Sequence, residues 1–251
     1  MPKLVILGSS AAVPDAQHEN THFAFLTGQE ILLVDCVSNP IVRLQKARLD
    51  LNKITNLILT HFHPDHVSGV PLLLMDMWLL GRQEPLNIHG LEHTLERVKT
   101  LMDLYNWKVW PEFFPVNFYA LPGDEPARVI ESEAWRVLSY PVCHLIPTIG
   151  LRFELLEGGA TLAYSSDTEP CPADIALAHH ADVLIHEATG ASAGHSSAAQ
   201  AGEVAQEAGV ERLYLIHYPG GGFDTQTLLS EASGTFDGPV ALAEDFMEID
   251  L

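Results

Sequence analysis

The residue types with the clearest capacity for chemistry lie together just after the short apolar run Leu57–Thr60. They form a His-x-His-x-Asp-His array of His61, His63, Asp65 and His66. Imidazole nitrogens and carboxylate oxygens are suitable zinc ligands, and alternate residues at an extended strand end face the same way. His61 and His63 can therefore bind one ion, while the turn at Pro64 lets the next two residues reach a second ion. Taken alone, the array could also be a solvated histidine loop.

Three further candidate ligands stand at the ends of other expected strands, and this favours a metal site over a solvated loop. His144 follows the expected strand 135–142, Asp167 follows 161–165, and His217 follows 213–216. Strand ends that meet at one edge of a sheet can deliver ligands from distant parts of a chain to a two-metal site. We therefore expect all seven side chains to converge.

The elements that must position these residues alternate between short apolar runs and helical patterns. We expect the other strands at 3–7, 23–26, 31–34, 86–89, 149–155 and 183–186, with a further strand within 107–122. Helices are expected at about 41–51, between 72 and 85, at 91–105 and 172–181, and at 198–208, where Ser197 and Gln200 form a capping box. No low-complexity linker divides the 251 residues, so the pattern predicts one α/β domain over 1–251.

The composition disfavours a polyanionic partner. The chain has 33 acidic and 13 basic residues, which gives a formal net charge of −20. Nucleic-acid affinity comes mainly from lysine and arginine that neutralise phosphates, so a large RNA is disfavoured. No apolar run is long enough for a signal peptide or a membrane span, and a cytoplasmic protein is expected. The three cysteines lack a Cys-x-x-Cys pair and are expected to be buried and unpaired.

The order of the candidate ligands resembles the metallo-β-lactamase superfamily, which carries the same histidine array, then a lone histidine, a bridging aspartate and a final histidine. The likeness extends to its ribonuclease Z branch, the tRNA 3′-end processing endonucleases. It runs from about residue 4 to residue 218 through the segments GSSAAVP, LLVDC, LTHFHPDHVSGVPLLL, HLIPTIGLRF, AYSSDT, LIHEATG and GHSSAAQAGEVAQEAGVERLYLIHY.

The resemblance implies an αββα sandwich of two mixed sheets with helices on the outer faces. It implies that His61, His63 and His144 bind one Zn²⁺, that Asp65, His66 and His217 bind another, and that Asp167 bridges the two. Manganese or iron would tolerate the same nitrogen and oxygen ligands. His195 is then the acid that assists the leaving group. Glu187 either orients His195 or a ligand, or simply ends its strand, whereas His186 is expected to face the core.

The chain departs from the branch in one way that bears on its substrate. Ribonuclease Z enzymes that grip tRNA carry a long arm between the lone histidine and the bridging aspartate, and residues 145–166 leave no room for it. The expected function is a dinuclear zinc phosphodiesterase that acts on a small diester, with a homodimer as the expected assembly. The alternatives are a tRNA 3′-endonuclease, a hydrolase of lactones, esters or sulfate esters, and a metal-binding protein without activity. The segment 218–223 is expected to form a cleft wall.

Overall fold

Two seven-stranded sheets form the centre of the molecule. The computed structural model describes residues 2–222 and 224–251, so Phe223 of the expected cleft wall lies outside the described residues. The first sheet has the order β14-β1-β2-β3-β4-β5-β6. Its strands are β1 (Lys3–Gly8), β2 (His22–Leu26), β3 (Ile31–Val34), β4 (Ile54–Leu59), β5 (Leu86–Leu91), β6 (Val116–Leu121) and β14 (Glu248–Asp250).

The second sheet has the order β13-β12-β11-β10-β9-β8-β7. Its strands are β7 (Ala127–Glu131), β8 (Trp135–Val142), β9 (Thr148–Leu155), β10 (Thr161–Tyr164), β11 (Val183–Glu187), β12 (Leu213–Ile216) and β13 (Val240–Leu242). Both sheets are mixed, because β3 to β6 and β10 to β13 pair in parallel while the remaining pairs are antiparallel.

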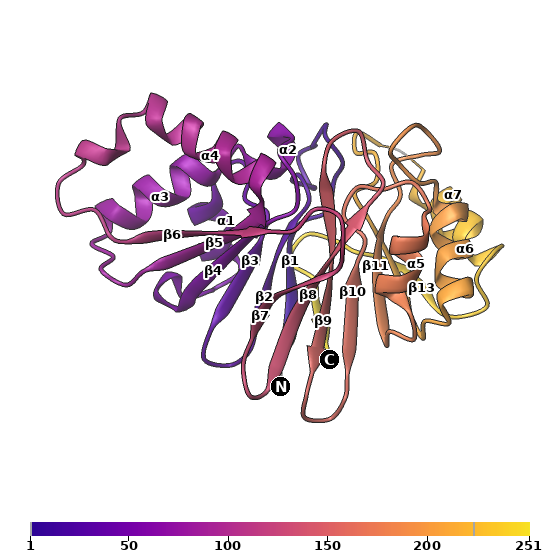
Figure 1. The fold of residues 1–251 in the computed structure, drawn as a ribbon. Helices are drawn as coiled ribbons and strands as arrows, with labels where there is room; N and C mark the ends of the chain where they lie inside the picture. Colours follow the sequence, from indigo (N-terminus) through magenta and orange to yellow (C-terminus); the bar gives the residue numbers. More distant parts are fainter. Residues whose placement is uncertain (1, 223) are drawn as a thin grey trace.

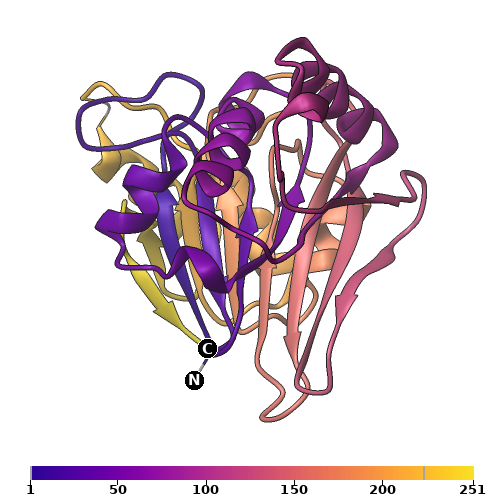
Figure 2. The same ribbon diagram turned by 90° about the vertical axis from the view of Figure 1, so that its left-hand side faces the viewer.

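Helices cover the outer face of each sheet, so the layers run helix, sheet, sheet, helix (Figure 1). On the first sheet they are α1 (Pro40–Lys46), α2 (Pro64–Val67), α3 (Val70–Leu79) and α4 (Glu92–Leu104), with the short 3₁₀ helices η1 (Leu51–Lys53) and η2 (Trp107–Val109). On the second sheet they are α5 (Pro172–Ala178), α6 (Ala198–Ala208) and α7 (Thr225–Ser233). The two chain ends lie side by side at the end of the sandwich opposite α2 (Figures 1 and 2).

Strand alternation explains why both faces of each sheet are buried. In β1, Leu4 and Ile6 pack between the two sheets, whereas Val5 and Leu7 pack under the helices of the first sheet. Successive side chains on a strand point to opposite faces, so a strand covered on both faces reads as a continuous apolar run. A third cluster fills the space between the second sheet and α5 to α7. This packing holds the strand ends in fixed relative positions.

The expected αββα sandwich is confirmed, with differences in single elements. The helix expected over 41–51 ends at Lys46 because Arg48 adopts a left-handed conformation (φ 57°), and Asp50 then caps η1. The strands β7, β13 and β14 were not expected. Cys36 and Cys171 are buried as expected, but Cys143 is exposed, because the chain reaches the surface just beyond β8. Among the described residues, no helix is long and apolar enough to cross a membrane.

Candidate metal centre and active-site cleft

The candidate ligands reach one site from the ends of several strands. His61 and His63 follow β4, while Asp65 and His66 lie in α2, whose first residue is Pro64. His144 follows β8, Asp167 follows β10 and His217 follows β12. His217 and Ser166 have left-handed backbones, with φ of 52° and 56°. Non-glycine residues adopt this conformation rarely, and here it occurs where the chain turns out of a strand at the site.

The first group of candidate ligands contains three imidazoles. The Nδ1 atom of His63 lies 3.1 Å from Nε2 of His61 and 3.1 Å from Nε2 of His144. Asp167 completes this group, and its Oδ2 atom lies 3.8 Å from Nε2 of His61 and 3.9 Å from Nε2 of His144. The four ligand atoms lie within 4.8 Å of one another, which is the spread expected around a single ion.

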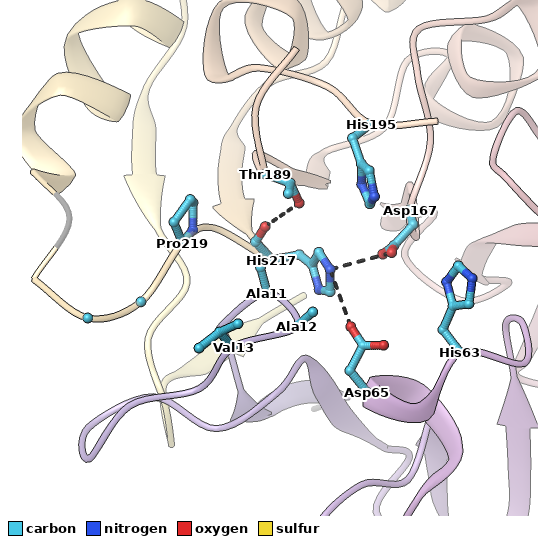
Figure 3. A pocket seen from close by; sticks show the side chains of 12 residues that line it. Ala11, Ala12, Val13, His63, Asp65, Asp167, Thr189, His195, His217 and Pro219 are labelled. Atoms are coloured by element: carbon cyan, nitrogen blue, oxygen red, sulfur yellow. Dashed lines mark hydrogen bonds and ion pairs between the residues drawn. The ribbon is translucent and has the colours of Figure 1, made fainter. Parts of the chain in front are cut away.

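The second group joins Asp65, His66 and His217, whose ligand atoms also lie within 4.8 Å of one another. Asp167 contacts this group as well. Its Oδ2 is 3.4 Å from Nε2 of His217 (Figure 3). Its Oδ1 is 3.5 Å from Nε2 of His66. One carboxylate therefore faces both groups, which is the geometry a bridging ligand requires.

For four of the five ligand imidazoles, neighbouring residues fix which nitrogen faces the centre. Thr60 donates its hydroxyl hydrogen to Asp35, so its oxygen accepts from Nδ1 of His61 at 3.0 Å. The Asp35 carboxylate also accepts from Nδ1 of His66 at 2.8 Å. A proton on Nδ1 leaves Nε2 with a lone pair, which is the form that binds a metal. Asp35 directly follows β3 in the LLVDC segment, but no pattern in the sequence indicates this role for it.

Two further imidazoles, those of His144 and His217, are oriented in the same way. Nδ1 of His144 donates to the carbonyl of Gly194 at 2.7 Å. Thr21 donates its hydroxyl hydrogen to the carbonyl of Ser10, so its oxygen accepts from Nδ1 of His217 at 3.0 Å. His144 and His217 therefore also direct the lone pair of Nε2 toward the centre. The sequence contained no signal for Thr21, because its role depends on a contact across almost the whole chain.

These residues fit a bound cation. Several nitrogen lone pairs and carboxylates face one another at short range, and without a cation they would repel. Nε2 of His66 and Oδ1 of Asp167 are buried and have no hydrogen-bond partner among the described residues. Buried polar atoms are rarely left unpaired in native proteins, so an ion is the expected partner. The donor set of imidazole and carboxylate suits zinc, manganese or iron.

The electrostatics of the centre favour metal binding. Burial lowers the pKa of His61, His63 and His144, which keeps these imidazoles neutral and able to coordinate. Burial also lowers the pKa of His66, but the carboxylates of Asp167 and Asp35 outweigh it and place the pKa well above its ordinary value. The same carboxylates would attract a metal cation at Nε2 of His66.

His195 lies beside the centre and pairs with Glu187. Nδ1 of His195 donates to Oε1 of Glu187 at 2.8 Å, and this hydrogen bond to the carboxylate raises the pKa of the imidazole. Glu187 is fully buried, and its carboxylate also accepts from the backbone N–H groups of Thr168 and Thr189 at 3.0 Å each. Of the two roles considered for Glu187, its geometry matches the orientation of His195.

Two other histidines near these motifs belong to the interior. His186 is fully buried and pairs with Asp174 at 2.9 Å, as expected for a residue that faces the core. His22 lies close to the first loop, yet it is buried, and its Nδ1 donates to the carbonyl of Asn20 at 2.8 Å. Burial lowers the pKa of His22 to about 4, and the residue does not line the cleft.

A cleft of about 470 Å³ opens beside the candidate metal centre. Five of the expected site residues line it: His63, Asp65, Asp167, His195 and His217. The remainder of the lining comes from residues 11–13 on one side, from residues 219–221 on the other, and from Thr189 (Figure 3). Of the wall expected over 218–223, residues 219–221 therefore line the cleft, whereas the contribution of residues 11–13 was not expected.

The family follows from this fold and a match along most of the chain. The family model described as the beta-lactamase superfamily domain matches residues 31–218. The chain belongs to this family. It is a metal-dependent hydrolase with the metallo-β-lactamase fold, and a histidine and aspartate cluster capable of binding metal lies at its centre.

Relatives within the superfamily carry ribonuclease Z names. The Ribonuclease Z of Methanothermobacter thermautotrophicus is 29% identical over 306 aligned positions, which cover 100% of this chain and 97% of the relative. The metallo-beta-lactamase fold protein YhfI from Bacillus subtilis superposes with a TM-score of 0.83 at 25% identity, covering 99% of this chain and 98% of its own. Human tRNase Z, short form, superposes with a TM-score of 0.79 at 24% identity, covering 99% of this chain and 98% of its own.

Proposed function

We propose that this protein is a dinuclear zinc phosphodiesterase that hydrolyses a small phosphodiester. The observation that carries the proposal is the pair of ligand groups that share Asp167, placed in a cleft with the His195–Glu187 pair. Two adjacent ions are suited to phosphodiester cleavage because, when bound, they lower the pKa of a water and offset charge on the phosphoryl oxygens. His61, His63 and His144 would hold one ion, Asp65, His66 and His217 the other, and Asp167 both.

The side chains of this site divide the remaining work. Asp65 lies at the cleft surface and would accept a hydrogen bond from the attacking water. This hydrogen bond would turn a lone pair of the water oxygen toward the phosphorus. His195 donates through Nδ1 to Glu187, which leaves its Nε2 to donate a proton to the leaving oxygen. The raised pKa of His195 keeps the imidazole protonated at a higher pH than a free histidine, and this suits an acid.

A small substrate is favoured over a tRNA. Between His144 and Asp167 the chain forms β9, a turn and β10, and the remaining residues are too few for a tRNA-binding arm. The 306 aligned positions exceed the 251 residues of this chain, so the archaeal ribonuclease Z has segments that this chain lacks. A tRNA 3′-endonuclease remains the second candidate because of the relatives' names. Homodimerisation and a cytoplasmic location also stay predictions.

Metal analysis and a substrate panel test the proposal together. Protein purified without chelator is expected to contain close to two transition-metal ions per chain, chiefly zinc. The same preparation is expected to cleave bis(p-nitrophenyl) phosphate faster than a lactone or an arylsulfate. Faster turnover of the lactone or the arylsulfate would contradict the phosphodiesterase assignment. A folded protein that carries almost no metal would contradict the enzymatic assignment.

A further inference from the structure

The cleft beside the metal centre has two walls from opposite ends of the chain. One is the Ala-Ala-Val segment 11–13, and the other is the Pro-Gly-Gly segment 219–221 (Figure 3). The only side-chain surface that these six residues offer is apolar. Thr189, which also lines the cleft, donates its hydroxyl hydrogen to the carbonyl of His217 at 2.8 Å. The cleft away from the metal centre therefore offers a substrate few side-chain hydrogen-bond donors.

The distance between the two walls is fixed by direct contacts. The N–H of Ala11 donates to the carbonyl of Tyr218 at 3.0 Å, and the N–H of Gly221 donates to Oδ2 of Asp15 at 2.9 Å. A Cβ atom at Gly220 would lie only 3.1 Å from the carbonyl oxygen of Val13. These hydrogen bonds hold the two walls close together, and this limits the width of the group that can lie between them.

The charges around the cleft disfavour a second anionic group on the substrate. None of the described residues that line it is a lysine or an arginine, and its acidic members, Asp65 and Asp167, belong to the ligand groups that would hold the cations. Asp15 adds a carboxylate behind the walls, and the hydrogen bond from the N–H of Gly221 helps to hold its pKa well below the usual range. Away from the metal centre, a substrate with a carboxylate or a further phosphate beyond the reacting diester would approach the Asp15 carboxylate, and the described lining offers no lysine or arginine to pair with it.

We propose that this cleft selects phosphodiesters whose organic group is compact, apolar and uncharged, and that Val13 sets this preference at the mouth. The proposal rests on the proposed function, because it names the class of diester that the same site would accept. Val13 lines the cleft while 77% of its surface is exposed, so its side chain can be replaced with little effect on the core. A cation at this position would reverse the charge preference.

Binding of phosphinates tests the proposal without any turnover. Dimethylphosphinate and dibutylphosphinate mimic a monoanionic diester, and their phosphorus–carbon bonds resist hydrolysis. Bis(2-carboxyethyl)phosphinate has arms similar in length to butyl but adds two carboxylates. Calorimetric titration of the metal-loaded protein is expected to show dibutylphosphinate binding about 10- to 60-fold more tightly than dimethylphosphinate, the gain from burying about two to three extra methylene groups. Bis(2-carboxyethyl)phosphinate is expected to bind more weakly than dibutylphosphinate.

A matched pair of variants tests whether Val13 sets the preference for an uncharged organic group. Val13→Lys is expected to reduce the ratio of the dibutyl to the dicarboxyethyl affinity by at least about fivefold, through attraction of the carboxylates. Val109→Lys is the control, because Val109 is also 77% exposed but lies in η2, outside the cleft lining. Equal affinities for the two dialkyl probes, tighter binding of the dicarboxylate, or equal effects of both variants would overturn the proposal. The proposed phosphodiesterase activity is judged separately by the substrate panel, so either can fail alone.

Discussion

At the scale of single residues, His195 differs from the seven candidate ligands in what its nitrogens contact. The ligand imidazoles direct a ring nitrogen toward one another, Nδ1 in His63 and Nε2 in the others, whereas His195 lines the cleft and holds its Nδ1 against Glu187. The ring of His195 packs edge-on against His144, with 4.8 Å between centroids. His195 is therefore placed to contact a bound substrate, which separates a proton donor from a metal ligand.

Two substitutions distinguish the proton donor from a metal ligand. His195→Ala is expected to keep both metal ions and to lose about 10²–10⁴-fold in kcat, the usual contribution of a general acid. Asp167→Ala is expected to lose metal, because its carboxylate faces both ligand groups. Elemental analysis and turnover of an alkyl diester, whose leaving group needs a proton, distinguish the two results. Loss of metal in His195→Ala would show that the role assigned to His195 is wrong.

The pairing of His195 with Glu187 also determines a pH dependence. An acid works only while it is protonated, and the hydrogen bond that His195 donates to Glu187 raises the pKa of His195 above its ordinary value. We expect kcat for an alkyl diester to fall with rising pH through a pKa above that of an ordinary histidine. In Glu187→Gln, this alkaline limb is expected to move to lower pH, because the carboxylate that stabilised the imidazolium is gone. An unchanged limb in a folded, metal-loaded variant would exclude His195 as the titrating acid.

At the scale of elements, the strand ends are held by helices packed on the outer faces, and α6 is a clear case. It begins at the capping box of Ser197 and Gln200, as the sequence predicts, and it ends at Gly209 with φ 67°. Gly202 lies inside the helix, where glycine is normally unfavourable. Its place is explained by α7, because a Cβ atom there would lie 2.1 Å from Oγ1 of Thr235 and 2.6 Å from the carbonyl oxygen of Ala232.

The contact between α6 and α7 reverses the usual effect of alanine in a helix. Gly202→Ala is expected to lower the free energy of unfolding by about 1–3 kcal/mol, because overpacking outweighs the gain in helix propensity. The control is Glu203→Ala, at an exposed position of the same helix, with an expected change within about 0.5 kcal/mol. Urea unfolding of both variants measures the difference. A more stable Gly202→Ala would mean that α7 can move away from α6 without cost.

At the scale of the whole molecule, the net charge of −20 opposes the binding of a polyanion. Cleavage of a small diester needs only the metal centre and the cleft, whereas a pre-tRNA needs further contacts that neutralise phosphates. The described cleft lining contains no lysine or arginine to supply them. The acidic surface and the short segment between His144 and Asp167 therefore favour a small substrate for separate reasons.

A direct comparison of two substrates tests this at near-physiological salt. We expect readily measured kcat/KM for bis(p-nitrophenyl) phosphate and weak cleavage of pre-tRNA that falls further as salt is raised. Cleavage is expected to be weak because few cationic side chains are available to displace counterions from the RNA, and salt weakens the few contacts that these side chains make. If pre-tRNA has the higher kcat/KM by orders of magnitude, a basic surface or a partner supplies the affinity, and the endonuclease assignment replaces the present one.

The sequence by itself determined the fold class and the candidate centre. Strands covered on both faces leave continuous apolar runs, and ligands at strand ends follow those runs directly. The strands and the candidate ligands can therefore be recognised from the sequence alone. The capping box of α6 and the proline that begins α2 are local signals of the same kind. The short edge strands β7, β13 and β14 carry weaker apolar patterns, and the sequence did not predict them.

Only the tertiary structure decided how the centre is supported and what surrounds it. Asp35 and Thr21 orient His66 and His217 through contacts that span 31 and 196 positions of the chain. The cleft pairs residues 11–13 with residues 219–221, and neither segment has a pattern that identifies the other. Local periodicity records which face of an element is buried, but it holds no information on which distant segment covers that face. That pairing arises only when the two sheets pack together and bring their strand ends to a common edge.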